Sequence, residues 1–243
     1  MTKLTIVDSH VLLGTEDHLS LTPDDLLRRM DLNGVETAIA RPMGAELIVR
    51  NREGNDTILK AHPRIKAMVS VNPWWGPESC LEELQRCRDQ GAVGLFLNPA
   101  RQGFFPTDSR ITPLLEQAEK FQWPVMFHTG TYIYADVLSV LERARQFPAL
   151  NFIAGFGGFA DMWFELPGVF AETENLYLDT SLLWGEAIQG ILQSTGASRL
   201  LFASAEPRNS IQVVLKVLER LELPEAQRES ILSGNAKRIF HLT

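Results

Sequence analysis

Eight short apolar segments recur along the chain at regular intervals, and this spacing constrains the fold more than any other feature. Their starts lie about 24 to 33 residues apart, which is enough for one strand, one helix and two loops per repeat. The expected strands cover residues 4–7, 37–40, 65–71, 93–97, 125–127, 151–154, 176–178 and 200–203.

The segments between these strands have helical patterns with recognisable ends. Thr22 followed by Pro23 is typical of an N-cap and a first helical position, and Gly34 is suited to end that helix. Further helices are expected at residues 77–90, 109–121, 135–147, 186–194, 210–221 and, as one or two terminal helices, 224–240.

Eight strand–helix repeats without a linker or a shift in composition predict a single domain over residues 1–243, an α/β protein with a (β/α)₈ TIM barrel. The main alternative is an open doubly wound sheet. That fold usually has a glycine-rich first turn, whereas residues 13–16 here read Leu-Gly-Thr-Glu and carry no phosphate-binding pattern.

Composition excludes several classes of function. A net charge of −7 and the lack of a Lys/Arg run argue against nucleic-acid binding. No apolar run approaches the roughly 18 residues of a membrane span, and the N-terminal residues do not resemble a signal peptide. The two cysteines, Cys80 and Cys87, form no disulfide framework, so we expect a cytoplasmic protein with free thiols.

Polar residues stand where two of the expected strands end. Asp8, His10 and Leu12 alternate along the first strand and therefore share one face. His128 ends the fifth strand, directly before Thr129. Since the functional groups of barrels collect at the C-terminal rim, we expect the two histidines to meet over the barrel mouth.

Several motifs extend over nearly the whole length. They read Val-Asp-Ser-His at 7–10, Val-Ser-Val-Asn-Pro at 69–73, Gln-Gly-Ala-Val-Gly at 90–94, Pro-Val-Met-Phe-His-Thr-Gly at 124–130, Leu-Tyr-Leu-Asp-Thr-Ser at 176–181 and Ile-Leu-Ser-Gly-Asn-Ala-Lys-Arg-Ile-Phe at 231–240. In order and spacing the chain resembles the amidohydrolase superfamily, specifically its amidohydrolase-related branch, which contains aminocarboxymuconate-semialdehyde decarboxylase-like enzymes and small lactone hydrolases.

The resemblance implies a metal site that this chain has largely lost. The family pattern has a second histidine where Leu12 stands, a histidine at the position of Gly155 and an aspartate at the position of Ala205. Zinc catalysis usually requires three protein ligands and an open position for water. We therefore expect no metal ligands and no cofactor, with weak zinc binding at most.

The remaining polar residues suggest roles without a metal. His10 and His128 are candidate general acid and base, with Asp8 to orient one of them or to bond backbone amides. A small anionic ligand would be bound by further side chains at strand ends, namely Arg41, Asn98, Asp179 and Arg208. The alternatives left open are a helix-capping role for Asn98 and a surface ion pair for Arg208.

Aromatic residues are frequent in the expected loops, at Trp74, Trp75, Phe104, Phe105, Trp163, Phe164 and Trp184. Large exposed rings seldom occur without a partner. We expect several of them to be buried in a homo-oligomer or against a related active barrel, while others fill the loops.

Two functional hypotheses follow. In the first, the chain is a pseudoenzyme or non-metal binding subunit that associates with itself or with an active homologue. In the second, it is a metal-independent or weakly metal-dependent hydrolase or decarboxylase that acts on a small carboxylated molecule through His10 and His128.

Overall fold

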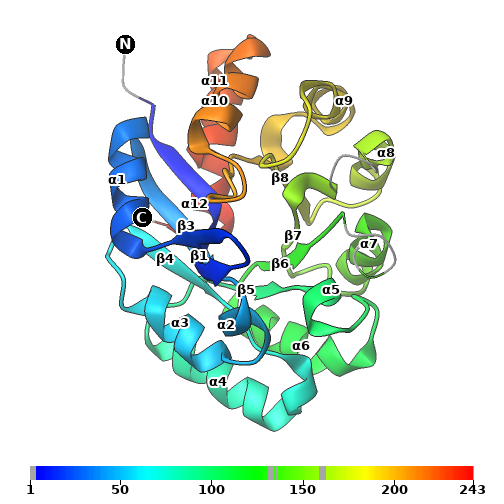
Figure 1. The fold of residues 1–243 in the computed structure, drawn as a ribbon. Helices are drawn as coiled ribbons and strands as arrows, with labels where there is room; N and C mark the ends of the chain where they lie inside the picture. The colour runs from blue at the N-terminus through cyan, green and yellow to red at the C-terminus, as the bar shows by residue number, and fades with distance from the viewer. Residues whose placement is uncertain (1–3, 131–133, 135, 159–162, 243) are drawn as a thin grey trace.

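A computed structural model describes residues 4–130, 134, 136–158 and 163–242. Eight parallel strands follow one another in the sheet: β1 (Ile6–Glu16), β3 (Val35–Pro42), β4 (Ile65–Val69), β5 (Gly94–Leu97), β6 (Val125–His128), β7 (Phe152–Gly155), β8 (Leu176–Asp179) and β9 (Leu200–Leu201). A ninth strand, β2 (Leu19–Leu21), is antiparallel to β1. Figure 1 shows the helices around the outside of the curled sheet.

Backbone hydrogen bonds join the first strand to the last segment of the sheet. The Ser9 amide donates to the Phe202 carbonyl at 2.9 Å, the Ala205 amide to the His10 carbonyl at 2.9 Å, and the Leu12 amide to the Glu206 carbonyl at 2.8 Å. These bonds close the sheet on itself and confirm the predicted (β/α)₈ barrel.

The barrel interior is filled by one apolar side chain from each of the parallel strands: Val7, Ile39, Met68, Phe96, Met126, Ile153, Tyr177 and Leu201. Residues that alternate with these, such as Leu95 and Phe127, face outward into the layer beneath the helices. This arrangement is the packed core expected of a barrel, and it leaves functional groups to the strand ends.

The helices are α1 (Pro23–Asn33), α2 (Ala45–Ile48), α3 (Asn51–Leu59), α4 (Pro77–Asp89), α5 (Pro99–Gln102), α6 (Thr112–Phe121), α7 (Val137–Gln146), α8 (Leu166–Ala171), α9 (Gly185–Thr195), α10 (Ile211–Arg220), α11 (Glu225–Glu229) and α12 (Asn235–Ile239). Thr22 caps α1 as predicted, since its hydroxyl oxygen accepts from the Asp25 amide at 3.2 Å. None of the twelve is long and apolar enough to cross a membrane, and no other helix in the described ranges is either.

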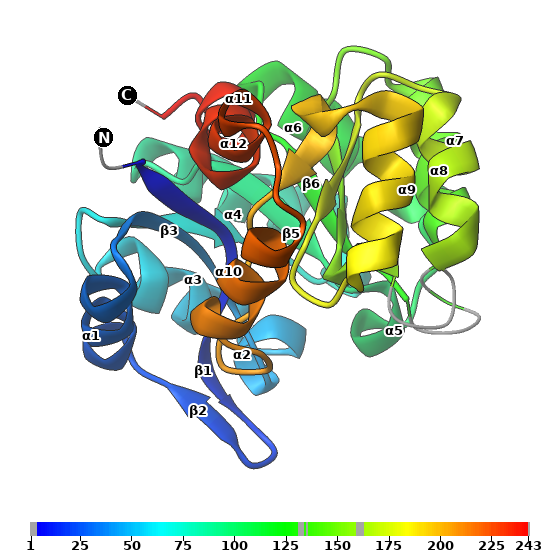
Figure 2. The same ribbon diagram turned by 90° about the horizontal axis from the view of Figure 1, so that it is seen from above.

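The first strand is longer than predicted. It continues past residue 7 to Glu16 and turns back into β2, and the resulting hairpin projects from the body of the barrel (Figure 2). Gly44 allows the hairpin to lie close to the chain that follows β3, because a Cβ on residue 44 would lie 2.1 Å from the Thr15 carbonyl oxygen. Apolar residues at 11–13 continue the strand, so the extension follows from the hydrophobic pattern beyond His10.

Candidate functional site

His10 lies at the centre of a buried polar group at the C-terminal rim of the barrel. Its Nδ1 atom is 2.7 Å from Asp179 Oδ2, and the Nε–H of Arg41 donates to its Nε2 atom at 3.1 Å. All three residues are buried, Arg41 being 2% exposed. These three residues were predicted site residues on three separate strands, and the fold brings them together.

The direction of these hydrogen bonds defines the protonation of His10. A guanidinium can only donate, so His10 Nε2 must accept and its proton must be on Nδ1, where it is donated to Asp179. Burial lowers the pKa of His10 more than Asp179 raises it, which keeps the imidazole neutral. The Nε2 lone pair, through which such a histidine could bind a metal, is therefore already occupied.

Asp179 acts as an acceptor for four donors. Its Oδ2 accepts from His10 and from the Phe156 amide at 2.8 Å, while its Oδ1 accepts from the Ser181 hydroxyl at 2.7 Å and the Ser181 amide at 3.1 Å. This carboxylate holds His10 in place, and it has little capacity left for a ligand.

Arg41 is a buried cation with neutral hydrogen-bond partners. Besides His10, its Nη1 donates to the Pro42 carbonyl at 3.0 Å, and its guanidinium carbon lies 4.2 Å from the centre of the Phe96 ring. Burial lowers the pKa of Arg41 to about 9, so that the side chain stays charged at neutral pH. Among the described residues, no carboxylate forms an ion pair with it.

His128 lies on the other side of Phe156. The Phe156 ring makes edge-to-face contacts with both imidazoles, with ring centres 4.7 Å apart in each case. Burial, followed by the charge of Arg41, lowers the pKa of His128 to about 3. Both candidate acid–base residues are thus neutral near pH 7.

Asp8 does not orient a histidine ring; it binds Ser204 instead. Its oxygens accept from the Ser204 amide at 2.8 Å and from the Ser204 hydroxyl at 2.5 Å, and the His10 amide lies 3.4 Å away. Burial raises the pKa of Asp8 to about 7 against the effect of these hydrogen bonds. The structure therefore selects the backbone-amide alternative for Asp8, and Asp179 is the carboxylate that orients the His10 ring.

Two of the positions at which the family pattern has ligands belong to an apolar cluster at the mouth. Leu12 and Ala205 pack with Met43 and Phe156, and all four are buried. At Gly155, a Cβ would lie 2.9 Å from the Phe127 carbonyl oxygen, so a larger side chain would require the backbone to shift.

The other predicted ligand-binding residues have structural contacts. The Asn98 side chain accepts from the Arg101 amide at 3.1 Å and caps α5, which is the capping alternative. Arg208 is partly exposed and forms an ion pair with Glu16. Glu16 also contacts Arg101, and neither Glu16 nor Arg101 was among the predicted site residues. Glu16 lies in the hairpin of β1 and β2, and Arg101 lies in the short helix α5. The pattern of expected strands and helices predicted neither the hairpin nor this helix.

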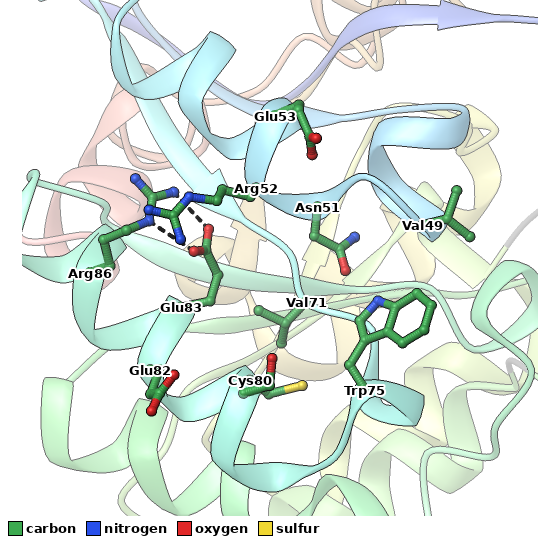
Figure 3. Close-up of a pocket in the computed structure, with 11 residues that line it drawn as sticks. Val49, Asn51, Arg52, Glu53, Val71, Trp75, Cys80, Glu82, Glu83 and Arg86 are labelled. Atoms are coloured by element: carbon green, nitrogen blue, oxygen red, sulfur yellow. Dashed lines mark hydrogen bonds and ion pairs between the residues drawn. The ribbon is translucent and has the colours of Figure 1, made fainter.

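A separate groove lies between α3 and α4 near η1 (Pro73–Trp75), with a volume of about 280 Å³ (Figure 3). Val71 and Cys80 line it together with Trp75, and Arg86 is held there by Glu83. It contains none of the predicted site residues, so it does not extend the polar group around His10.

Comparisons with known proteins agree with this architecture. The family model described as Amidohydrolase matches residues 18–242, and the chain therefore belongs to this family. A gamma-resorcylate decarboxylase from Rhizobium sp. (strain MTP-10005) is 26% identical over 290 aligned residues, which cover 90% of this chain and 87% of that protein.

Solved structures of similar shape include a 2,6-dihydroxybenzoate decarboxylase from Rhizobium, with a TM-score of 0.82, 21% identity and 99% coverage of both chains. Another is a dihydroxybenzoic acid decarboxylase from Polaromonas sp. JS666 with bound manganese, with a TM-score of 0.77, 20% identity, and 99% and 98% coverage of this chain and that one. At these identities the likeness demonstrates the shared barrel fold.

The described residues at this barrel mouth offer few donor atoms to a divalent metal of the kind that the Polaromonas structure holds. His10 Nε2 is bonded to a cation, and Leu12 and Ala205 have no donor atoms. Across the described ranges, no group of three or more His, Cys, Asp or Glu side chains is arranged to hold a metal ion.

Proposed function

We propose that this amidohydrolase-family barrel is a non-metal binding subunit that takes a small carboxylated molecule at its mouth through Arg41. In this proposal the ancestral metal-dependent chemistry is lost, and the fold is retained as a ligand-binding scaffold. The observation that carries the proposal is the buried guanidinium of Arg41, whose hydrogen bonds go to the neutral His10 ring and a backbone carbonyl.

Burying a charge is costly unless an opposite charge compensates for it. The charges of Glu16 and Asp179 raise the pKa of Arg41 without a direct ion pair, and a carboxylate ligand would supply such a pair. The relatives support this class, because their names specify gamma-resorcylate and 2,6-dihydroxybenzoate as the molecules on which they act.

Replacing Arg41 with methionine is expected to weaken the binding of 2,6-dihydroxybenzoate by about 10- to 100-fold, because one charge-assisted contact is lost. Isothermal titration calorimetry on dialysed protein would measure this. Arg110→Met is the matched control, since Arg110 is also on the rim and stacks on Trp74. Equal affinity in the wild type and Arg41→Met, with both proteins folded by circular dichroism, would contradict the proposal.

A second candidate function retains chemistry. The hydrogen bond between Asp179 and His10 favours it, because a carboxylate-oriented imidazole is a common general base. Against it, both histidines are neutral near pH 7, and a neutral imidazole is a much weaker acid than an imidazolium, so neither is suited to protonate a decarboxylated carbon. Release of carbon dioxide from 2,6-dihydroxybenzoate by metal-free protein, abolished in His10→Ala, would favour this candidate over a pure binding role.

We further propose that a second copy of the chain covers the rim. Trp74, Trp75, Phe105, Phe164 and Trp184 are between 45% and 70% exposed, and all lie in segments that follow strands at the C-terminal end. Phe104 does not belong to this set, because it is buried in the monomer at 2% exposure, contrary to its inclusion among the expected interface rings. The side chain of Trp163 lies outside the described part of the chain.

Sedimentation velocity at micromolar concentration is expected to show a dimer that dissociates in a Trp75→Glu, Trp184→Glu double variant. Each buried interface ring can contribute roughly 2 kcal/mol or more, and a carboxylate at its position would be desolvated without a partner. Leu32→Glu is the control, because Leu32 is 81% exposed at the end of α1, away from the rim. A wild type that stays monomeric would refute the self-association.

A further inference from the structure

A polar pocket of about 590 Å³ lies at the end of the barrel opposite to the mouth. It is lined by Tyr177, the second residue of β8, by Arg199, which directly precedes β9, and by Thr195, the last residue of α9. Arg238 of α12 also lines it, and we call it the basal pocket. Because parallel strands begin at the N-terminal face of a barrel, this pocket is separate from the mouth, where the active sites of barrel enzymes lie.

Arg238 is held in the basal pocket by neutral acceptors. Its Nη1 donates to the Tyr177 hydroxyl at 2.8 Å, and its Nη2 donates to the Ser198 carbonyl at 2.8 Å and to Asn235 Oδ1 at 3.4 Å. Ser198 directly precedes Arg199 in the chain. The contact with its carbonyl therefore brings the Arg238 guanidinium next to the backbone that carries the second arginine.

Arg199 has fewer contacts than Arg238. Its Nη1 donates to the Thr173 carbonyl, and its guanidinium carbon lies 5.8 Å from the centre of the Phe170 ring. The side chain is partly buried, and this burial lowers the pKa of Arg199 more than the nearby Tyr177 and Glu174 raise it. Arg199 is thus a partly desolvated cation that no carboxylate pairs with in the described part of the chain.

Most of the donors of the two guanidinium groups have no protein acceptor. A guanidinium has five N–H donors and no acceptor. Arg238 uses three of its five and Arg199 uses one, so six have no acceptor among the described residues. Arg238 is exposed and Arg199 is partly exposed, which leaves both within reach of a ligand from solvent.

The charges that line the basal pocket do not cancel. Glu174 is the one carboxylate in the lining, and it is exposed and forms no ion pair with a described residue. Its neighbour Glu172 is paired with Arg145. Two arginines against one carboxylate leave an excess positive charge, which attracts anions to this face of a protein whose net charge is −7.

We infer that the basal pocket binds a phosphate group between Arg199 and Arg238. A phosphate presents more acceptor oxygens and more negative charge than a carboxylate, so it can accept from both guanidinium groups at once. Tyr177 is 4% exposed and offers no open ring face, and the rest of the lining consists of hydroxyl, amide and carboxylate side chains. The ligand class is therefore free phosphate or the phosphate ester of a small polar molecule. The inference does not depend on the proposed function at the mouth.

Isothermal titration calorimetry with inorganic phosphate and with glycerol 3-phosphate tests the site, at fixed ionic strength with chloride as the background anion. Arg199→Gln is expected to weaken the binding of both probes by about tenfold, because charge-assisted contacts are lost. Glu174→Gln is expected to tighten both by about threefold, because it removes a carboxylate near the bound anion. Arg199 is the residue to replace, since Arg238 also joins β8 to α12 through Tyr177.

Arg88→Gln is the matched control. Arg88 also donates to a single backbone carbonyl, that of Phe121, and lies over an aromatic ring, but it is not part of the basal pocket. Its replacement is expected to change either affinity by less than about twofold. Circular dichroism and thermal unfolding verify that each variant is folded.

The outcomes also separate the two sources of phosphate. Tighter binding of glycerol 3-phosphate than of inorganic phosphate assigns the site to an ester, and the reverse order assigns it to the free ion; either result supports the site if Arg199→Gln removes the binding. Absence of saturable binding of both probes would overturn the inference. Equal losses in Arg199→Gln and Arg88→Gln, or acetate that binds as tightly as phosphate, would overturn it as well.

Discussion

Protein loaded with excess zinc and then dialysed is expected to retain well under one equivalent of the metal. The Nε2 lone pair of His10 is bonded to Arg41, whose positive charge also repels a divalent cation. Leu12 and Ala205 are part of an apolar cluster and cannot contribute ligands. Two imidazoles would leave most of the coordination to water, which gives weak binding compared with a complete site. Elemental analysis by mass spectrometry measures the retained zinc.

His10→Ala and His128→Ala serve as controls for zinc that binds elsewhere. Residual metal should be the same in both variants and in the wild type. Stoichiometric zinc in the wild type that disappears in either variant would contradict this prediction and restore a metal-dependent hydrolase or decarboxylase as the leading hypothesis.

The largest expected effect on stability comes from Asp179. Its replacement with alanine leaves the Nδ1–H of His10 and the Phe156 amide buried without their acceptor, and we expect a loss of about 3 to 5 kcal/mol in the free energy of unfolding. Urea denaturation at pH 7, followed by tryptophan fluorescence, measures this loss.

An asparagine at the same position should restore little of the stability. All four partners of Asp179 donate, whereas the amide nitrogen of asparagine can only donate in turn. Moving the His10 proton from Nδ1 to Nε2 would not help, because the Nε2–H would then face the Nε–H of Arg41, and both groups are donors. Ser181→Ala removes only one of the donors and is expected to cost about 1 kcal/mol. If Asp179→Asn is as stable as the wild type, the assignment of the Nδ1–H form of His10 is wrong.

The barrel could be predicted from the sequence because its signal is repeated. Eight apolar segments at similar intervals, helix caps such as Thr22 and glycines such as Gly34 all depend on local chemistry, and each supports the same fold. The helices that were missed are short or atypical. In α3 the apolar pattern is interrupted by Gly54, which is required because a Cβ there would lie 2.7 Å from the Cβ of Glu46 in α2. Such a contact between two elements is not visible in a local pattern.

The residue types at the site were also evident in the chain. Arg41, His128 and Asp179 stand at or next to the ends of their strands, and His10 lies within the longer first strand at the same rim; parallel strands in a barrel bring their carboxyl ends to one rim. The substitutions at Leu12, Gly155 and Ala205 could equally be recognised against the family pattern. The positions of these residues on the expected strands were therefore enough to select them as candidate site residues.

The pairing of those participants required the folded chain. Asp8 and Asp179 are both carboxylates near His10, and Asp8 is the nearer of the two in sequence and shares a face of the first strand with His10. In the structure, however, Asp179 contacts the imidazole, whereas Asp8 accepts hydrogen bonds from Ser204, 196 residues away. Likewise, nothing local indicates that Glu16 bridges Arg101 and Arg208. Hydrogen bonds act over about 3 Å, and which donor comes within that distance of which acceptor depends on how the strands close into a barrel and on what the loops between them leave exposed.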